Sequence, residues 1–148
     1  HTRYPLVTGV QTCALPIYVE GHDAAGKAAI LANVLMNAGL RPRDVACKGI
    51  TQISAADVKA AQAAGERWKL IAEVTRTPSG VMASVQPMRL PVTHPLAGVA
   101  GATNALTYTT DLLGDVTIIG AGAGGVATGF AVVGDLLAIH RGERERAG

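Results

Sequence analysis

The stretch VEGHDAAGKAAILANVLMN, residues 19–37, decides how this chain folds. From residue 23 to residue 37 apolar side chains recur at helical spacing, which predicts a helix that Gly39 and Pro42 end. Asp23 and Lys27 stand four residues apart at its start, so both side chains lie on one face. A carboxylate and an amine in this arrangement can bind an amino-acid substrate and deliver a proton to it. The simpler interpretation is an exposed ion pair that adds roughly 0.2–0.5 kcal/mol to the helix.

The residues beyond this helix predict one mixed sheet. Residues 44–51 are predicted as a short strand, and 54–65 as a second helix with Ser54 as N-cap and Asp57 three residues on. Strands are predicted at 68–75 and 81–87 around the turn TPSG, and again at 103–110 and 116–119. A glycine run, GAGAGG at 120–125, then leads to a final helix over 126–140. This order predicts an α+β fold, a mixed β-sheet with helices packed on it.

The first eighteen residues differ from the rest. Residues 7–17, VTGVQTCALPI, match codon for codon a translation of a common sequencing-adapter oligonucleotide. We therefore expect residues 1–18 to be a read artefact that is unstructured and packs on nothing, and we exclude them from fold reasoning. The alternative is an ordinary disordered N-terminus. A signal peptide is not indicated, because Pro5, Gln11 and Pro16 interrupt the apolar residues.

Composition excludes several classes of protein. A chain of 148 residues fits one domain, and a net charge of +2 without a basic stripe does not indicate nucleic-acid binding. No apolar run reaches the length of a membrane span. The four histidines show no metal-ligand spacing, so no metal site is predicted. Outside the first eighteen residues only Cys47 remains, which gives no disulfide framework and favours a reducing cytoplasm.

Three ordered blocks resemble homoserine dehydrogenase, over about residues 19–140. They are VEGHDAAGKAAILA, GITQISAADVKAAQAAGERWKLIA, and HPLAGVAGATNALTYTT with GDVTIIGAGAGG and GDLLAI. Members of that family reduce L-aspartate 4-semialdehyde to L-homoserine with NADH or NADPH, in the pathway to threonine, methionine and isoleucine. The resemblance implies a cytoplasmic homodimeric oxidoreductase with a small-molecule substrate. It implies no nucleic-acid or membrane partner.

The resemblance also implies roles for three residues. Lys27 matches the proton-donating lysine of the family, Asp23 its substrate-binding aspartate, and Gly124 a glycine that contacts the dinucleotide. A lysine near a bound carbonyl can donate a hydrogen bond and then a proton to the developing alkoxide. Glycine lets backbone N–H groups approach a cofactor closely. The family usually has an acidic residue where this chain has Tyr18, and a further substrate-binding glutamate upstream has no counterpart here.

The glycine run formally contains the G-x-G-x-x-G fingerprint of dinucleotide-binding domains. A complete Rossmann unit is not predicted, because no second strand follows the final helix. The simpler interpretation of the run is a tight strand-to-helix turn. By resemblance, residues 19–125 form the catalytic, substrate-binding domain, and residues 126–148 return to a cofactor domain that the chain is expected to lack. The chain alone is therefore expected to be inactive.

Two alternatives remain open at this point. One is the substrate domain of another dehydrogenase, such as aspartate-semialdehyde dehydrogenase, whose chemistry needs a cysteine nucleophile with a histidine base. Cys47 lacks the flanking pattern for that role. The other is a non-catalytic α+β module that dimerises or binds a partner through its sheet.

Overall fold

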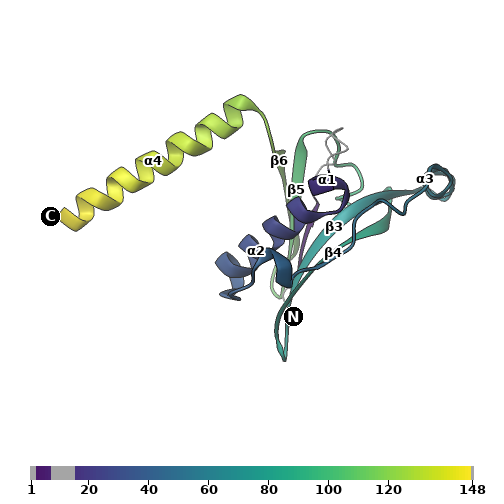
Figure 1. Cartoon of the computed structure of the whole chain (residues 1–148), viewed down its shortest axis with the longest axis horizontal. Helices are drawn as coiled ribbons and strands as arrows, with labels where there is room; N and C mark the ends of the chain where they lie inside the picture. Colours follow the sequence, from purple (N-terminus) through teal and green to yellow (C-terminus); the bar gives the residue numbers. More distant parts are fainter. Residues whose placement is uncertain (1–2, 8–15, 148) are drawn as a thin grey trace.

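The computed structural model describes residues 3–7 and 16–147 of the chain. Its strands form one mixed sheet in the order β2-β4-β3-β1-β5-β6, in which β2 and β4 are parallel and every other pair is antiparallel. The elements in chain order are β1 (Arg3–Val7), α1 (Pro16–Val19), α2 (His22–Met36), the 3-10 helix η1 (Pro42–Asp44), β2 (Ala46–Cys47), α3 (Ala55–Ala63), β3 (Glu66–Thr77), β4 (Gly80–Pro91), β5 (Thr103–Thr110), β6 (Gly114–Ala121) and α4 (Gly125–Ala147). The predicted α+β class is confirmed (Figure 1).

Helix α2 lies on one face of the sheet and forms the larger core with it. Its buried side chains are mostly alanines, and Ala28 and Ala32 are fully buried. Val74 and Val85 meet them from β3 and β4. Small side chains bring the helix close to the sheet, and each fully buried valine contributes roughly 1.5–3 kcal/mol. The bulkier Ile30 and Val34, whose spacing predicts the helix, are 63% and 75% exposed.

The opposite face of the sheet carries a smaller core. The loop between β4 and β5 folds back over it and buries Leu96 and Val99 against Ile71 of β3. The Lys69 ammonium donates a hydrogen bond to the Val99 carbonyl, and burial, with a smaller effect of Arg67, lowers the pKa of Lys69. Both faces of the sheet are therefore covered in part, by α2 on one side and by this loop on the other.

The predicted elements are confirmed with shifted bounds. Ser54 caps α3 as predicted, since the Asp57 N–H donates to Ser54 Oγ at 3.2 Å and the Ser54 N–H donates to Asp57 Oδ2 at 2.9 Å. The strand predicted over 44–51 is only two residues long, because η1 ends at Asp44 and the chain turns away after Cys47. Strands β3, β4 and β6 and helix α4 are longer than predicted.

The expectation that residues 1–18 are unstructured is wrong for two segments. Strand β1 lies between β3 and β5, with Leu6 opposite Ala72 on one side and Leu106 on the other. Residues 16–18 begin helix α1. Backbone pairing requires no particular side chains, which is why a segment of foreign composition can still complete a sheet. Residues 1–2 and 8–15, to which the same expectation applies, lie outside the described part.

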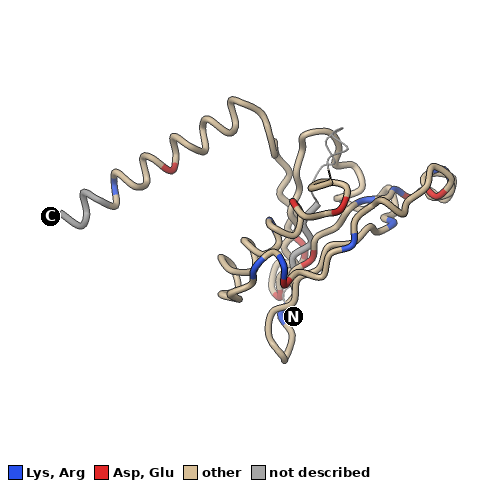
Figure 2. The backbone as a smooth tube through the Cα atoms, viewed as in Figure 1, with Lys and Arg blue, Asp and Glu red and all other residues tan. Residues whose placement is uncertain are grey.

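Helix α4 extends away from the sheet (Figure 1). Between residues 125 and 140, Asp135 is the one residue among Asp, Glu, Lys and Arg (Figure 2). Its apolar side chains are exposed, with Phe130 at 80% and Val133 at 53%. Within the described residues no helix is both long enough and apolar enough to cross a membrane.

Candidate functional site

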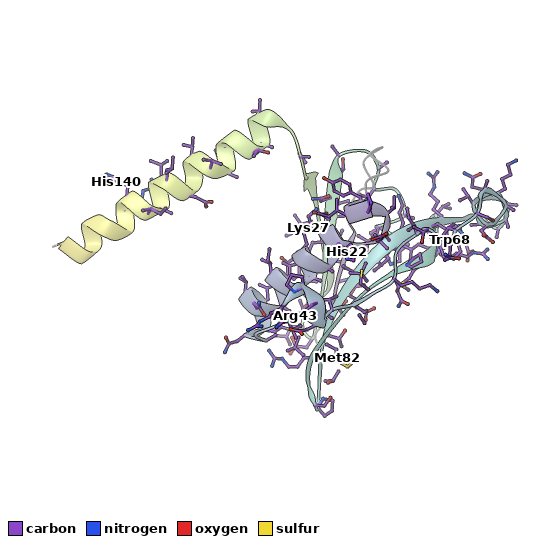
Figure 3. All side chains as sticks on the ribbon, in the orientation of Figure 1. His22, Lys27, Arg43, Trp68, Met82 and His140 are labelled. Atoms are coloured by element: carbon purple, nitrogen blue, oxygen red, sulfur yellow. The ribbon has the colours of Figure 1, made fainter. Side chains whose placement is uncertain are left out.

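Asp23 and Lys27 lie on the first turns of α2 and contact each other. Lys27 Nζ is 2.8 Å from Asp23 Oδ2, and the two side chains are 38% and 29% exposed. At this exposure the pair contributes at most a few tenths of a kcal/mol to the stability of the helix. Its contribution to stability is therefore small. Lys27 lies on the part of α2 near α1 (Figure 3). The acid and the amine are thus together and open to a ligand, as the sequence predicts.

The turn that starts α2 is held against the segment after β2. Gly21 is the N-cap and has a φ of 86°, in the left-handed region that favours glycine. Gly49 lies so close to the turn that a Cβ on it would be 2.2 Å from the Val19 carbonyl oxygen. The Ile50 N–H donates to the same oxygen at 2.8 Å. Two of the three resembling sequence blocks therefore meet at this turn. Their contact fixes the start of α2, which carries Asp23 and Lys27.

Cys47 supports the same turn. Its Sγ donates to the Glu20 carbonyl at 3.3 Å, and burial raises the pKa of the thiol. A raised pKa disfavours the thiolate form, which is the nucleophilic form of a cysteine. Glu20 and His22 contact each other at 3.1 Å between largely exposed side chains.

A cavity of about 260 Å³ opens beside the ion pair. Asp23 and Lys27 line it from α2, Asn104 lines it from β5, and Gly122 and Ala123 line it from the segment after β6. Tyr18 and Ala102 complete the lining. The structure thus brings the glycine run, residues 120–125, to the charged pair across nearly a hundred residues of sequence.

Gly124, the predicted cofactor contact, lies just beyond this cavity. It has a φ of 127°, and its carbonyl accepts a hydrogen bond from the Thr128 N–H at 2.9 Å. It therefore forms the turn from which α4 starts, and a Cβ on it would meet nothing within 4 Å. Gly122, two residues earlier, is the glycine that lines the cavity. Its N–H donates to the Ala102 carbonyl at 2.8 Å.

Sequence reasoning missed Asn104, Gly122 and Ala123 as lining residues. The signal was present for all three, because Asn104 lies in the third resembling block and Gly122 and Ala123 lie in the glycine run. Nothing in the local pattern shows that these segments meet. Only the pairing of β5 with β6, with Asn104 opposite Gly120, brings them together.

The strand before the glycine run is not part of a Rossmann unit. β6 pairs antiparallel with β5 at the edge of the sheet, whereas the dinucleotide fingerprint follows a parallel strand of a βαβ unit. Without that unit, the run can offer backbone groups to a cofactor but does not build a complete dinucleotide-binding domain here.

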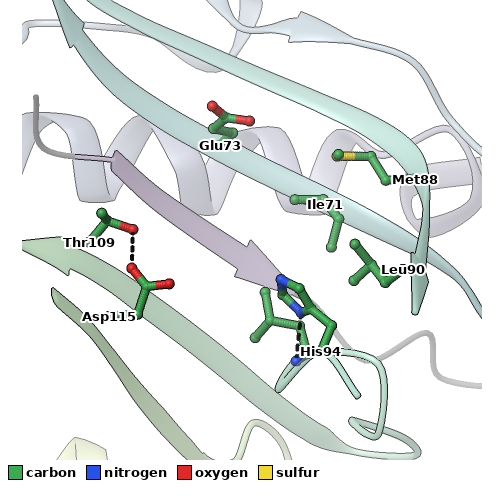
Figure 4. A pocket seen from close by; sticks show the side chains of 8 residues that line it. Ile71, Glu73, Met88, Leu90, His94, Thr109 and Asp115 are labelled. Carbon is green, nitrogen blue, oxygen red and sulfur yellow. Dashed lines mark hydrogen bonds between the residues drawn. The ribbon is translucent and has the colours of Figure 1, made fainter. Parts of the chain in front are cut away.

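A second cavity, of about 200 Å³, lies on the sheet face opposite α2 (Figure 4). His94, Glu73 and Asp115 are its titratable residues. His94 Nδ1 accepts from the Leu96 N–H at 3.1 Å, and Asp115 accepts from the Thr109 hydroxyl at 2.7 Å. This bonding agrees with a structural role for His94 in its loop. Across the described segments, no group of three or more His, Cys, Asp or Glu residues is placed to hold a metal ion.

Known proteins match most of this chain. The family model described as homoserine dehydrogenase matches residues 18–137. The NAD(+)-dependent homoserine dehydrogenase of Pseudomonas canavaninivorans is 48% identical over 124 residues, and the homoserine dehydrogenase of Corynebacterium glutamicum is 44% identical over 128 residues. The crystal structure of Staphylococcus aureus homoserine dehydrogenase at pH 6.0 aligns with a TM-score of 0.85 and 27% identity, over 97% of this chain and 43% of that one.

The matches cover the chain more fully than they cover the relatives. Each of the two relatives matches 83% of this chain, but the chain spans only 35% of the Pseudomonas protein and 29% of the Corynebacterium protein. The family match begins at Tyr18, one residue before the boundary at Val19 that the sequence predicts. Asp23, Lys27, Asn104 and the glycine run all lie inside it.

Proposed function

The chain belongs to the homoserine dehydrogenase family, and we propose that it is the substrate-binding part of an enzyme that reduces L-aspartate 4-semialdehyde to L-homoserine. The observation that carries this proposal is the contact between Asp23 and Lys27 in a cavity whose far side is the glycine run. This arrangement supports the proposal, because a carboxylate that can bind the substrate ammonium, an amine that can transfer a proton and backbone that can approach a cofactor line one cavity.

In the proposed reaction Lys27 supplies the proton. Its ammonium donates to the substrate carbonyl oxygen, and the proton moves to that oxygen as negative charge develops there. Asp23 accepts hydrogen bonds from the substrate ammonium and holds Lys27 in place through their 2.8 Å contact. A lysine has three N–H groups, so Lys27 can keep the bond to Asp23 while it binds the substrate.

A nicotinamide dinucleotide supplies the hydride when it is bound. The residues present fit a partial contact with such a group: Gly124 has open space where a Cβ would stand, and it directly follows Ala123, which lines the same cavity as Lys27. We assign Gly124 to the cofactor on this basis. The Pseudomonas relative is named as NAD(+)-dependent, and we leave NADH and NADPH as the two cofactors to be compared.

The same proposal extends to the organisation of the protein. Residues 19–125 form the catalytic, substrate-binding unit, and residues 126–148 connect it to the cofactor-binding part of the enzyme. The enzyme acts as a homodimer in the cytoplasm, in the pathway to threonine, methionine and isoleucine. Family membership is what supports these three statements.

The test is an assay of a full-length enzyme that carries residues 19–148 of this chain. We expect consumption of NADH or NADPH with aspartate semialdehyde, and the reverse reaction with homoserine. Residues 1–148 alone, assayed in parallel, should give no turnover, because the glycine run is the one cofactor contact proposed for them. A full-length enzyme with no turnover under either cofactor contradicts the proposal.

A further inference from the structure

Asn104 and Gly122 lie very close to each other in the wall of the candidate site. A Cβ on Gly122 would lie 2.1 Å from Asn104 Nδ2, 2.2 Å from its Cγ and 2.5 Å from its Oδ1. Ordinary van der Waals contacts of a Cβ begin near 3.4 Å. The carboxamide of Asn104 therefore occupies the space that any side chain at position 122 would need.

The backbone around this contact is fixed on both sides. Asn104 is paired with Gly120 in the β5–β6 ladder, and the Gly122 N–H donates to the Ala102 carbonyl at 2.8 Å. The glycine run therefore leaves the sheet at a set position relative to β5. Asp23 and Lys27 face the same cavity from α2.

We propose that Asn104 is a positioning residue of this site, whose carboxamide sets how far the glycine run stands from Asp23 and Lys27. A side chain at position 122 would displace either that carboxamide or the glycine run. This inference rests on the proposed function. It adds Asn104 to the residues of the site, together with a steric restriction at position 122.

The physical argument is one of distance. With a methyl group at position 122, the distance between that group and the Asn104 carboxamide must increase by more than 1 Å. Either the glycine run moves away from β5, or the Asn104 carboxamide turns out of its place. Both movements change the wall that faces Lys27. A displacement of about 1 Å at a reacting site can cost about 10²-fold in rate.

The experiment is a double-mutant cycle in the full-length enzyme with Gly122→Ala, Asn104→Ala and both together. Asn104→Ala removes the three atoms nearest to the added methyl group. Gly98→Ala is the matched control, because Gly98 is an exposed loop glycine without positive φ and its Cβ would meet nothing within 4 Å. The measurements are kcat, KM, the dissociation constants of NADH and NADPH from fluorescence, and the melting temperature.

We expect Gly122→Ala to lower kcat/KM by about 10²-fold and to weaken binding of the preferred dinucleotide, with little change in melting temperature. Asn104→Ala should be less damaging, and the double variant should recover at least about tenfold over Gly122→Ala, because its methyl group enters the space that the carboxamide leaves. Gly98→Ala should match the wild type in all four measurements.

Two results overturn the inference. One is a Gly122→Ala enzyme within twofold of the wild type in kcat/KM and in dinucleotide affinity. The other is a double variant no better than Gly122→Ala. A wild-type enzyme without turnover contradicts the proposed function instead, and the cycle measured by dinucleotide binding still decides the role of Asn104.

Discussion

Lys27 and Asp23 share one face of α2 and one ion pair, so their effects on the reaction should not add. Lys27→Ala is expected to lower turnover by about 10²–10⁴-fold, the usual loss when a general acid is removed, with dinucleotide binding unchanged. Asp23→Ala should weaken substrate binding as well as turnover. Steady-state kinetics of the two single variants and the double variant measure the coupling.

Lys59 provides the matched lysine control for this experiment, because it is exposed on α3 and is absent from the lining of the candidate site. Lys59→Ala should leave kcat and KM at the wild-type values. A Lys27→Ala enzyme that keeps turnover within a few-fold of wild type would mean that the proton comes from another group.

Gly49 should be irreplaceable for a different reason, since the atoms it approaches belong to the backbone. Its Cβ would lie 2.2 Å from the Val19 oxygen and 2.5 Å from Glu20 Cα, neither of which can rotate away. Gly49→Ala is therefore expected to destabilise the fold by about 1–3 kcal/mol, as overpacking does. Gly26→Ala, inside α2 with nothing within 4 Å of its Cβ, should stabilise by about 0.5–1 kcal/mol. Urea unfolding of both variants tests this, and equal effects would contradict it.

At the residue scale the sequence predicted Asp23 and Lys27 because their relation is local. Four residues of helix are enough to place them on one face. Asn104 and Gly122 could not be predicted, because their contact depends on the register of β5 with β6 and on the turn that follows. The exposure of Ile30 likewise could not be predicted, since helical periodicity does not show which face a sheet will cover.

At the scale of single elements, the start of α3 should respond to acid. The pKa of Asp57 lies below its ordinary 3.8. The largest cause is the hydrogen bond from the Ser54 hydroxyl, followed by the one from the Ser54 N–H, and Arg89 has a smaller effect. A carboxylate with a lowered pKa stabilises the fold above its unfolded-state pKa, and this stabilisation is lost as the pH falls through the folded-state pKa.

Ser54→Ala removes the larger of these hydrogen bonds, so the pKa of Asp57 should rise toward 3.8. The variant should be less stable than the wild type near neutral pH, and the part of that difference due to Asp57 should vanish in strong acid. Carboxyl chemical shifts and thermal unfolding followed from about pH 6 to about pH 2 measure both effects. An unchanged Asp57 titration in the variant would contradict the assignment.

Helix α4 should make the isolated chain bind hydrophobic dyes or self-associate. Phe130, Val133 and Leu137 on this helix are 80%, 53% and 48% exposed. Contiguous apolar surface of this kind promotes association. Exchange of these three residues for glutamine should reduce dye fluorescence and shift the chain toward the monomer in sedimentation. A wild-type chain that is monomeric and binds no dye would contradict this expectation.

At the scale of the whole molecule, β1 joins two halves of the sheet. It is the only described strand between β3 and β5. The sequence gives no sign of it, because residues 3–7 have neither a strand pattern nor a partner nearby in the chain. The β3–β4 hairpin was predicted, since its turn is local, whereas β5 and β6 were predicted only as separate strands.

Removal of residues 1–15 therefore tests the sheet as a unit. It takes away β1 and leaves the facing edges of β3 and β5 without a partner strand. We expect a loss of more than about 1 kcal/mol in the free energy of unfolding, the size of a typical damaging point mutation. Removal of residues 143–148, at the far end of α4, is the control and should change little. Equal stability of the shortened and complete chains would show instead that the segment contributes nothing to the fold, as its composition suggests.

The central place of β1 also bears on how the chain folds. The β3–β4 and β5–β6 pairs are each formed by neighbouring segments and can close early, whereas β1 pairs with residues about 65 to 105 positions further along. Until that long loop closes, β3 and β5 each present an open edge to other chains. Refolding at rising protein concentration should therefore lose yield to aggregation before the hairpins themselves fail to form, because β1 is expected to be the last strand to dock.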